Sequence, residues 1–391
     1  MTTVGDPLER LLTPAALADP SPVYSDLRDN APVLWHEGIE SWIVSRYSDC
    51  ALVIKDVERY ACDERRVKGA AKDTVELPVA LQSLQSLDPP ENGPLRHLLI
   101  EGLRAQVSRD FEQDLALRVE KAAARLAGRE FDFVSEFSGP VVLDSIGQVL
   151  GVEPPETSWF LARANAVTAA MDAPIRPERT APGIAARKAL SELVNEWFGK
   201  PPADGLLRYL ARHWDPRTVD RQVLINSIRA VLHAGFESMI SLVNLATAAL
   251  LDSPQGLAAL PPARLDPAVH ELVRYTSPVR IEGRIAVADT VIGAQQIDGG
   301  SFVTMMLGAA NRDPARFERP ETLDLSRTDN PHLGFGRGLH SCVGMHLAVT
   351  QARVIFAALS RLHPKATLVG RPSYRPTATI RGIDHMVVRF S

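Results

Sequence analysis

The feature that most constrains the fold is a proline-free segment over residues 218–251. As a helix, its 34 residues would span roughly 50 Å at about 1.5 Å per residue. Apolar residues lie on most of its faces, and a helix that is apolar nearly all round is buried. The segment therefore predicts a central core helix, and a chain of 391 residues with 45% apolar residues is long enough to surround it.

The rest of the chain divides into a helical body over 94–275 and β-rich portions near 31–47, 279–308 and 366–391. The fold class is therefore mainly α with small β-sheets, and we expect a single domain over 1–391. The stretch 309–342 shows no regular pattern, and so long an irregular segment usually carries function. Besides the central helix, we expect helices at 94–105, 109–127, 136–151, 157–172, 181–198 and 343–362.

Composition excludes several classes of protein. The net charge of −4 argues against a dedicated nucleic-acid binder. The three cysteines contain no C-x-x-C pair, which excludes a disulfide framework and a thiolate zinc cluster. The N-terminal residues lack the pattern of a signal peptide, and no uninterrupted apolar run approaches the ~20 residues that span a bilayer. We expect a cytoplasmic protein that has no membrane anchor.

Three residues in the middle of the central helix do not suit a buried position: Gly235, Glu237 and Ser238. Glycine inside a helix costs about 1 kcal/mol relative to alanine. A buried carboxylate without a partner is also costly. Such local violations tend to mark functional sites.

Cys342 lies where the glycine-containing loop 335–344 turns into the helix expected at 343–362. Free N–H groups and the positive end of the helix dipole at such a position favour a thiolate, which is a ligand for haem iron. From spacing alone, an inert buried cysteine and a nucleophile with His340 as its base are equally good interpretations.

Residues 335–344, FGRGLHSCVG, resemble the haem-binding loop F-G-x-G-x-H-x-C-x-G of the cytochrome P-450 family at all six fixed positions. Five other segments resemble family elements in the same order: 88–96 (D-P-P-E with L-R), 234–238 (A-G-x-E-S), 271–274 (E-x-x-R), 311–314 (N-R-D-P) and 324–327 (D-x-x-R). The resemblance extends over nearly the whole chain, and it implies the cytochrome P-450 fold, with haem between the central helix and the cysteine-loop helix.

The resemblance also implies the haem contacts. Cys342 is the expected axial ligand and the only metal ligand, Phe335 is expected to pack on the thiolate side of haem b, and Gly344 completes the loop. The haem propionates are expected to bind Arg96, Arg284 and His340. The family often has His at the position of Asn92, which can donate a hydrogen bond but brings no charge.

Further roles follow from the resemblance. Gly235 is expected to make room for O₂, and Glu237 and Ser238 to relay protons, with Ser replacing the usual Thr. A hydroxyl that bonds back to its own helix is the alternative role for Ser238. Glu271 and Arg274 are expected to form a buried network with Arg327 that braces the cysteine loop, whereas an exposed ion pair is the simpler interpretation.

The substrate pocket is expected to be apolar, with Leu77, Val79, Leu81, Leu84, Met171, Phe236, Val279 and Ile380 among its residues. Two polar residues join this set. His233 lies one turn before Glu237, and packing in the core is its alternative role. Arg280 suggests an anionic substrate, unless it pairs with Glu282 or a propionate.

The predicted function is a haem-thiolate monooxygenase that inserts one oxygen atom from O₂ into a small organic substrate. Electrons are expected from NAD(P)H through a separate ferredoxin and ferredoxin reductase, because 391 residues leave no room for a fused reductase. The alternatives are a P-450-type peroxygenase or coupling enzyme, and a non-catalytic haem-thiolate sensor, which would not need the Glu237–Ser238 pair.

Overall fold

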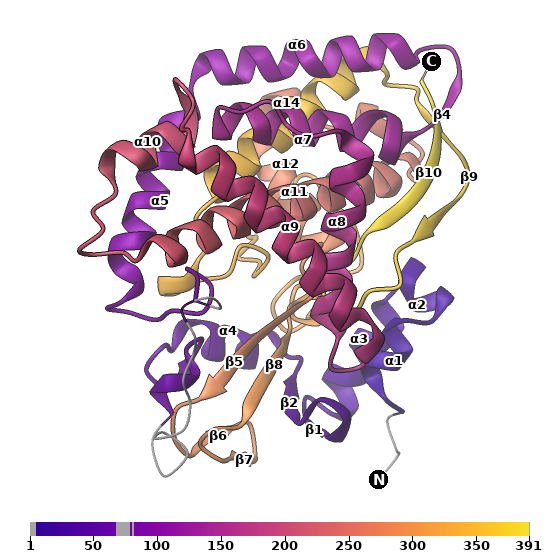
Figure 1. The fold of residues 1–391 in the computed structure, drawn as a ribbon. Helices are drawn as coiled ribbons and strands as arrows, with labels where there is room; N and C mark the ends of the chain where they lie inside the picture. Colours follow the sequence, from indigo (N-terminus) through magenta and orange to yellow (C-terminus); the bar gives the residue numbers. More distant parts are fainter. Residues whose placement is uncertain (1–4, 68–78, 80–81, 391) are drawn as a thin grey trace.

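The computed structural model describes residues 5–67, 79 and 82–390. Helices make up most of this part of the chain, and α11 runs through the middle of the helical part (Figure 1). The helices are α1 Pro7–Leu11, α2 Pro14–Ala18, α3 Ser21–Asn30, α4 Tyr47–Lys55, α5 Asn92–Gln106, α6 Arg109–Leu126, α7 Gly139–Leu150, α8 Thr157–Ala169, α9 Thr180–Gly199, α10 Gly205–His213, α11 Arg221–Leu251, α12 Leu265–Thr276, α13 Leu307–Ala310 and α14 Met345–Leu362.

The strands form three small sheets in the described residues, of order β1-β2-β8-β5-β3, β4-β10-β9 and β6-β7. Among the strands of the described residues, β2 and β8 pair in parallel and the other pairs are antiparallel. The strands are β1 Val33–His36, β2 Ser41–Val44, β3 Tyr60–Ala61, β4 Glu130–Asp132, β5 Ile281–Ala286, β6 Thr290–Ile292, β7 Gln295–Ile297, β8 Phe302–Met306, β9 Thr367–Tyr374 and β10 Ile383–Arg389. The mainly α fold class with small sheets is therefore confirmed.

The predicted helices match the observed ones except at their ends. The residues that cap a helix set where it begins and ends. The central helix begins at Arg221 rather than at 218, because the Asp220 side chain accepts hydrogen bonds from the first free amides, those of Gln222 and Val223. Helix α7 ends at Leu150 because Gly151 adopts a φ of 83°. Helix α10 and the short strand β4 were not predicted.

Helix α11 forms the centre of the core, and α7, α8, α9, α12 and α14 all pack against it. By length and composition this helix could cross a membrane, but 72% of its apolar window is buried inside the protein. Its apolar surface is therefore that of a core helix, as the sequence predicts.

Candidate active site

The cysteine loop forms a tight turn immediately before α14. Gly336 and Gly338 adopt φ values of 63° and 71°, which only glycine adopts freely. The Cys342 amide donates to the Phe335 carbonyl at 2.8 Å and closes the loop. The Cys342 side chain is exposed, and it lines a pocket of about 160 Å³ with Arg96 and Ser341.

Cys342 is exposed to this pocket rather than to open solvent, and the surrounding protein desolvates the thiol and raises its pKa, although the Gly344 amide and the Arg96 charge act in the opposite direction. The amide at the helix terminus thus favours the thiolate, as predicted, but burial outweighs this effect in the protein by itself. A metal ion deprotonates a coordinating thiol outright, so iron would supply what the helix terminus does not.

One face of α11 is accessible in the middle of an otherwise buried helix. Gly235 is exposed, and Ala230, Ala234 and Ser238 are half-buried, whereas most residues around them are buried. These positions recur at helical spacing and so share a face. The Ser238 hydroxyl donates to the Ala234 carbonyl at 2.7 Å. This is the bond back to its own helix that the sequence offers as the alternative role of Ser238. That bond leaves the hydroxyl oxygen on the accessible face, where it can still accept a hydrogen bond from another donor.

Glu237 lies on a different face of α11 and is completely buried. Arg375, which directly follows β9, donates to its Oε1 through Nη1. Arg375 also donates through Nε to Asp384 Oδ1 at 2.7 Å. No sequence pattern singles out Arg375 or Asp384, because neither lies in a motif that the sequence presents.

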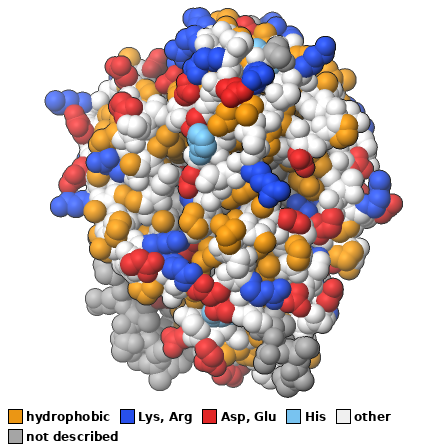
Figure 2. Space-filling model, turned by 90° about the vertical axis from the view of Figure 1, so that its right-hand side faces the viewer, with side chains coloured by type: hydrophobic (Ala, Val, Ile, Leu, Met, Phe, Trp, Pro, Cys, Tyr) orange, Lys and Arg blue, Asp and Glu red, His pale blue; other side chains and the backbone are white. Residues whose placement is uncertain are grey.

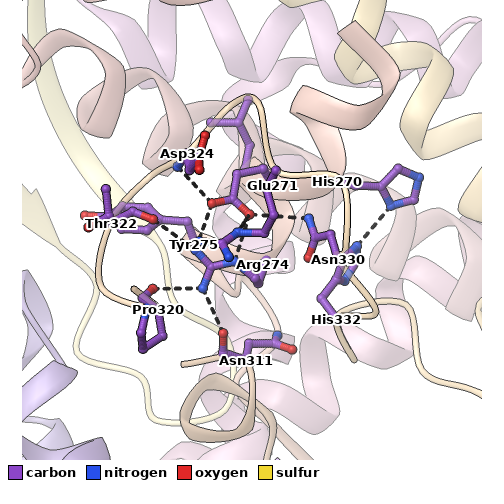
Figure 3. Close-up of polar contacts among 12 residues, drawn as sticks. His270, Glu271, Arg274, Tyr275, Asn311, Pro320, Thr322, Asp324, Asn330 and His332 are labelled. Atoms are coloured by element: carbon purple, nitrogen blue, oxygen red, sulfur yellow. Dashed lines mark hydrogen bonds and ion pairs between the residues drawn. The ribbon is translucent and has the colours of Figure 1, made fainter. Parts of the chain in front are cut away.

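Glu271 and Arg274 of α12 are completely buried and lie at the centre of a polar network (Figure 3). Arg274 donates to both Glu271 oxygens at 2.8 Å and to the carbonyls of Asn311, Pro320 and Thr322. Arg327 donates to Glu271 at 3.0 Å. The interpretation as an exposed ion pair is therefore wrong, and the network holds the irregular stretch 309–342 in place.

Two histidines lie beside this network (Figure 3) and contact the cysteine loop. His332 Nε2 lies 3.0 Å from His270 Nδ1, and the Gly334 amide donates to His332 Nδ1 at 3.1 Å. Burial lowers the pKa of His332 to about 3, so its ring is neutral. Both rings contact Phe335, with centroids 5.6 and 5.8 Å from the phenyl ring. Sequence analysis missed both histidines, which lie outside the short motifs.

Comparisons with known proteins agree with this geometry. The cytochrome P-450 family model matches residues 264–362, which contain α12, the bracing network and the cysteine loop. A putative cytochrome P-450 of Mycobacterium tuberculosis is 30% identical over 94% of each chain. The chain belongs to the cytochrome P-450 family. Among other curated relatives, nocardicin C N-oxygenase of Nocardia uniformis is 31% identical, with 93% of this chain and 92% of the relative covered. The 6-deoxyerythronolide B hydroxylase of Saccharopolyspora erythraea is 30% identical, with 94% and 95% covered.

Solved structures show the same fold. Ligand-free CYP164A2 of Mycobacterium smegmatis matches with a TM-score of 0.84 and 28% identity, over 98% of this chain and 99% of the other. CYP109E1 of Bacillus megaterium, solved with testosterone, matches with a TM-score of 0.86 over 97% and 100%, but at 22% identity it shows the fold alone. The chain is an enzyme of the P-450 monooxygenase class, whose members bind haem and receive electrons from redox partners.

The residues expected to bind the haem propionates fit a carboxylate-bearing group. Arg96 reaches the cysteine loop and donates to the Ser341 carbonyl at 2.7 Å. The His340 ring contacts Asp88 at 2.6 Å through Nε2, which leaves Nδ1 for another partner. Arg284 bonds Glu282 and the Gly283 carbonyl, but its buried Nε has no partner among the described residues. Two guanidinium groups and an imidazole are the donors that propionates require.

The Asn92 side chain does not point to this group. It is buried, and its Nδ2 donates to the Leu87 carbonyl at 3.0 Å. The residue therefore stabilises the entry into α5 and leaves the propionates to Arg96, Arg284 and His340.

The predicted substrate residues fall into two groups. Val279 and Ile380 pair across an isolated antiparallel bridge, so the structure brings these two together. Phe236 is completely buried, with its ring 4.8 Å from that of Phe160 on α8. A substrate contact for Phe236 is therefore contradicted, because it belongs to the packing between α8 and α11.

His233 is also a core residue. Its Nε2 lies 3.2 Å from Thr168 Oγ1 and from the Ala164 carbonyl, both on α8, and burial lowers its pKa. The ring is neutral and holds two helices together. The predicted pocket role of His233 is therefore replaced by its alternative role as a packed histidine.

Arg280 is completely buried and donates to the carbonyls of Thr377 and Ala378, the latter at 3.1 Å. Its Nη1 is buried and has no partner among the described residues. Glu282 accepts a hydrogen bond from Arg284 rather than from Arg280. The prediction that Arg280 anchors an anionic substrate is therefore not supported, and the side chain instead fixes the loop after β9.

The remaining predicted pocket residues differ in exposure. Val79 and Met171 are exposed, and Leu84 is half-buried against the core. Leu77 and Leu81 lie outside the described residues. A surface pocket of about 700 Å³ lies between α6, α7 and the start of α10, and none of the predicted site residues lines it.

Proposed function

We propose that this P-450 inserts one oxygen atom from O₂ into a small organic substrate, by hydroxylation, epoxidation or oxidative demethylation. The observation that carries the proposal is the accessible face of α11, where Gly235 provides room and Ser238 provides a hydroxyl. A haem-thiolate sensor needs neither this room nor this hydroxyl beside the haem. Curated relatives named as a hydroxylase and an N-oxygenase support oxygen insertion as the class of reaction.

In this proposal, haem b bound through Cys342 supplies the O₂-activating iron. Arg96, Arg284 and His340 hold the propionates, and Phe335 packs beside the ligand sulfur. Ser238 holds a proton or water on the accessible face of α11, and Glu237 is the acid that supplies the proton. The Val279–Ile380 bridge is the apolar surface that we assign to the substrate.

Electrons are proposed to come from NAD(P)H through a ferredoxin and its reductase. The docking patch for the ferredoxin would lie beside the cysteine loop and consist of the arginines Arg104, Arg109, Arg337 and Arg353. Arg353 is paired with Glu112 and Asp266, and Arg104 with Glu101, which reduces the net charge of such a patch. Charge steering by this docking patch is therefore expected to be modest. On another side of the molecule, the one drawn in Figure 2, basic and acidic side chains are interspersed as well.

The test is turnover of the haem-loaded protein with isotopically labelled O₂, NADPH, and a surrogate ferredoxin and ferredoxin reductase. Substrates are first selected by the spin-state shift that they cause in the haem spectrum. One labelled oxygen atom in the product supports a monooxygenase. Product formed from hydrogen peroxide but not from O₂ and NADPH identifies the peroxygenase instead, and absence of product under both conditions favours the sensor.

A further inference from the structure

Two arginines lie behind the apolar surface that we assign to the substrate. Val279 and Ile380 pair across an antiparallel bridge, and the amides of the next residues, Arg280 and Arg381, donate the flanking hydrogen bonds at 2.9 and 2.8 Å. Successive side chains of an extended chain point to opposite faces. Arg280 and Arg381 therefore point to the same side, away from the face of Val279 and Ile380.

Both arginines are buried without a carboxylate partner. The exposed fraction is 0% for Arg280 and 8% for Arg381. Each guanidinium donates to two backbone carbonyls, Arg280 in the loop between β9 and β10 and Arg381 in α2, and neither forms an ion pair within the described part of the chain. Asp172 binds the same loop through two amides, but its charge is paired with Arg179. A buried cation without a counter-charge is costly, so the two arginines require a negative partner.

Three hydrogen-bond donors at this place have no partner among the described residues: Arg280 Nη1, Arg381 Nε and the hydroxyl of Tyr24 on α3. Tyr24 is itself only 2% exposed. Its hydroxyl lies beside Gly308, where an added Cβ would clash with the oxygen, and the Gly308 amide donates to the Arg280 carbonyl at 3.2 Å. Tyr24 thus reaches the backbone of Arg280 from the N-terminal part of the chain.

These groups also act on one another electrostatically. Burial, followed by the charge of Arg280, lowers the pKa of Arg381 to about 10, and the Tyr24 hydroxyl acts in the opposite direction. An arginine with this pKa is still charged at neutral pH. Two cations that repel each other are therefore buried together, with a hydroxyl beside them.

The chemistry of the donors identifies the class of ligand. An arginine N–H group can only donate, and a tyrosine hydroxyl without a partner can donate as well. A water molecule at this place would bring protons that need acceptors of their own, and it would leave the two positive charges uncompensated. An anion accepts from all three donors and supplies the missing negative charge.

We propose that Tyr24, Arg280 and Arg381, here called the anion site, bind one small inorganic anion such as chloride. Because at most 8% of any of the three residues is exposed, a monatomic ion suits the site better than the carboxylate of an organic ligand. The bound ion joins α3 to the residues that follow Val279 and Ile380. It therefore holds the N-terminal helices against the back of the surface assigned to the substrate.

The decisive variant is Tyr24→Phe, because it removes one donor that has no partner in the described protein and keeps the ring. The matched control is Tyr209→Phe, which removes a hydroxyl from α10, outside the anion site. The haem-loaded proteins are unfolded with urea in sodium gluconate, and chloride replaces gluconate stepwise at constant ionic strength. The unfolding equilibrium constant is measured by far-ultraviolet circular dichroism.

We expect chloride to lower the unfolding constant of the wild type and of Tyr209→Phe by about tenfold or more, following the factor 1 + [chloride]/Kd. Tyr24→Phe should need at least about tenfold more chloride for the same effect, since it retains two of the three donors. In gluconate alone it should be no less stable than the wild type. Arg280→Met should lose the chloride dependence, and if it does not fold, Tyr24→Phe decides.

A second measurement locates the ion directly. Crystals of the haem-loaded protein are soaked in sodium bromide, and anomalous diffraction is recorded at the bromine edge. A peak within hydrogen-bond distance of Tyr24 Oη, Arg280 Nη1 and Arg381 Nε supports the anion site. Density there without an anomalous signal identifies water and overturns the proposal.

The solution data give two further ways to overturn it. Equal chloride dependence in the wild type and Tyr24→Phe overturns the proposal, and a bromide peak in that case is an adventitious ion only. Stabilisation by acetate but not by chloride or bromide overturns the choice of a monatomic ion and assigns the site to a carboxylate.

Discussion

Replacing Glu271 with Gln tests how the cysteine loop is held. The carboxylate accepts five hydrogen bonds: two from Arg274, one each from the side chains of Arg327 and Asn330, and one from the Asp324 amide. Glutamine would present an NH₂ group to donors and remove the charge that two arginines share. Breaking a buried ion pair by removing one partner costs about 3–5 kcal/mol.

The protein offers a control with similar geometry at the surface. Asp329 accepts two hydrogen bonds from Arg316, each 2.8 Å long, but its side chain is 76% exposed. Exposed pairs contribute about 0–1 kcal/mol, so Asp329→Asn should change stability little. The two substitutions remove the same charge and differ mainly in burial.

The assay is urea unfolding of the haem-loaded proteins, followed by far-ultraviolet circular dichroism and by haem absorbance. We expect Glu271→Gln to lower the free energy of unfolding by about 3–5 kcal/mol, which is roughly two to four powers of ten in the unfolding equilibrium. Haem should also be released at a lower urea concentration. Arg274 binds carbonyls of the stretch 309–342, which leads into the cysteine loop, so loosening Arg274 should loosen the loop. A loss no larger than that of Asp329→Asn would refute the buried-network argument.

Three other predictions concern the site. Cys342→Ala should abolish the reduced-carbonyl Soret band at the family's namesake position, because Cys50 is buried and burial raises the pKa of Cys62 to about 12; an unchanged spectrum would exclude Cys342 as the ligand. Ser238→Ala should lower product formed per NADPH more than substrate affinity, and Ser238→Thr should preserve or improve it, as measured by product and NADPH assays; full coupling in Ser238→Ala would contradict the relay. Arg280→Leu should weaken an acidic ligand and its neutral amide equally, by spin-state titration, because Arg280 binds the carbonyls of Thr377 and Ala378; a selective loss for the acid would restore its role as an anion anchor.

Much of the fold was predictable because its signals are local. The central helix follows from apolar periodicity without proline, and its first turn is set by Asp220. The cysteine loop follows from glycines with positive φ and a fixed pattern of neighbours. Strand β4 was not predictable in the same way, because its three residues pair with 387–389 at the other end of the chain.

The site was predictable only in part. Motifs identified Cys342, Glu237 and Ser238, but the partner of Glu237 comes from a position 138 residues away. Phe236 was assigned to the pocket as an apolar residue of the central helix, which lines the pocket in the family that the sequence resembles. Helical geometry contradicts that inference, since successive residues of a helix are rotated by about 100° and Phe236 faces α8.

The same geometry explains why a buried helix carries glycine, glutamate and serine in its middle. Positions 230, 234, 235 and 238 form the accessible face, where a small residue and a hydroxyl are useful. Positions 233 and 237 lie one turn apart on another face, where His233 joins α8 and Glu237 joins Arg375. The unfavourable carboxylate is thus offset by a cation from the C-terminal hairpin rather than by anything on the helix. Because the loop of that hairpin also carries Ile380, paired with Val279, the element that holds the acid is continuous with the apolar surface assigned to the substrate.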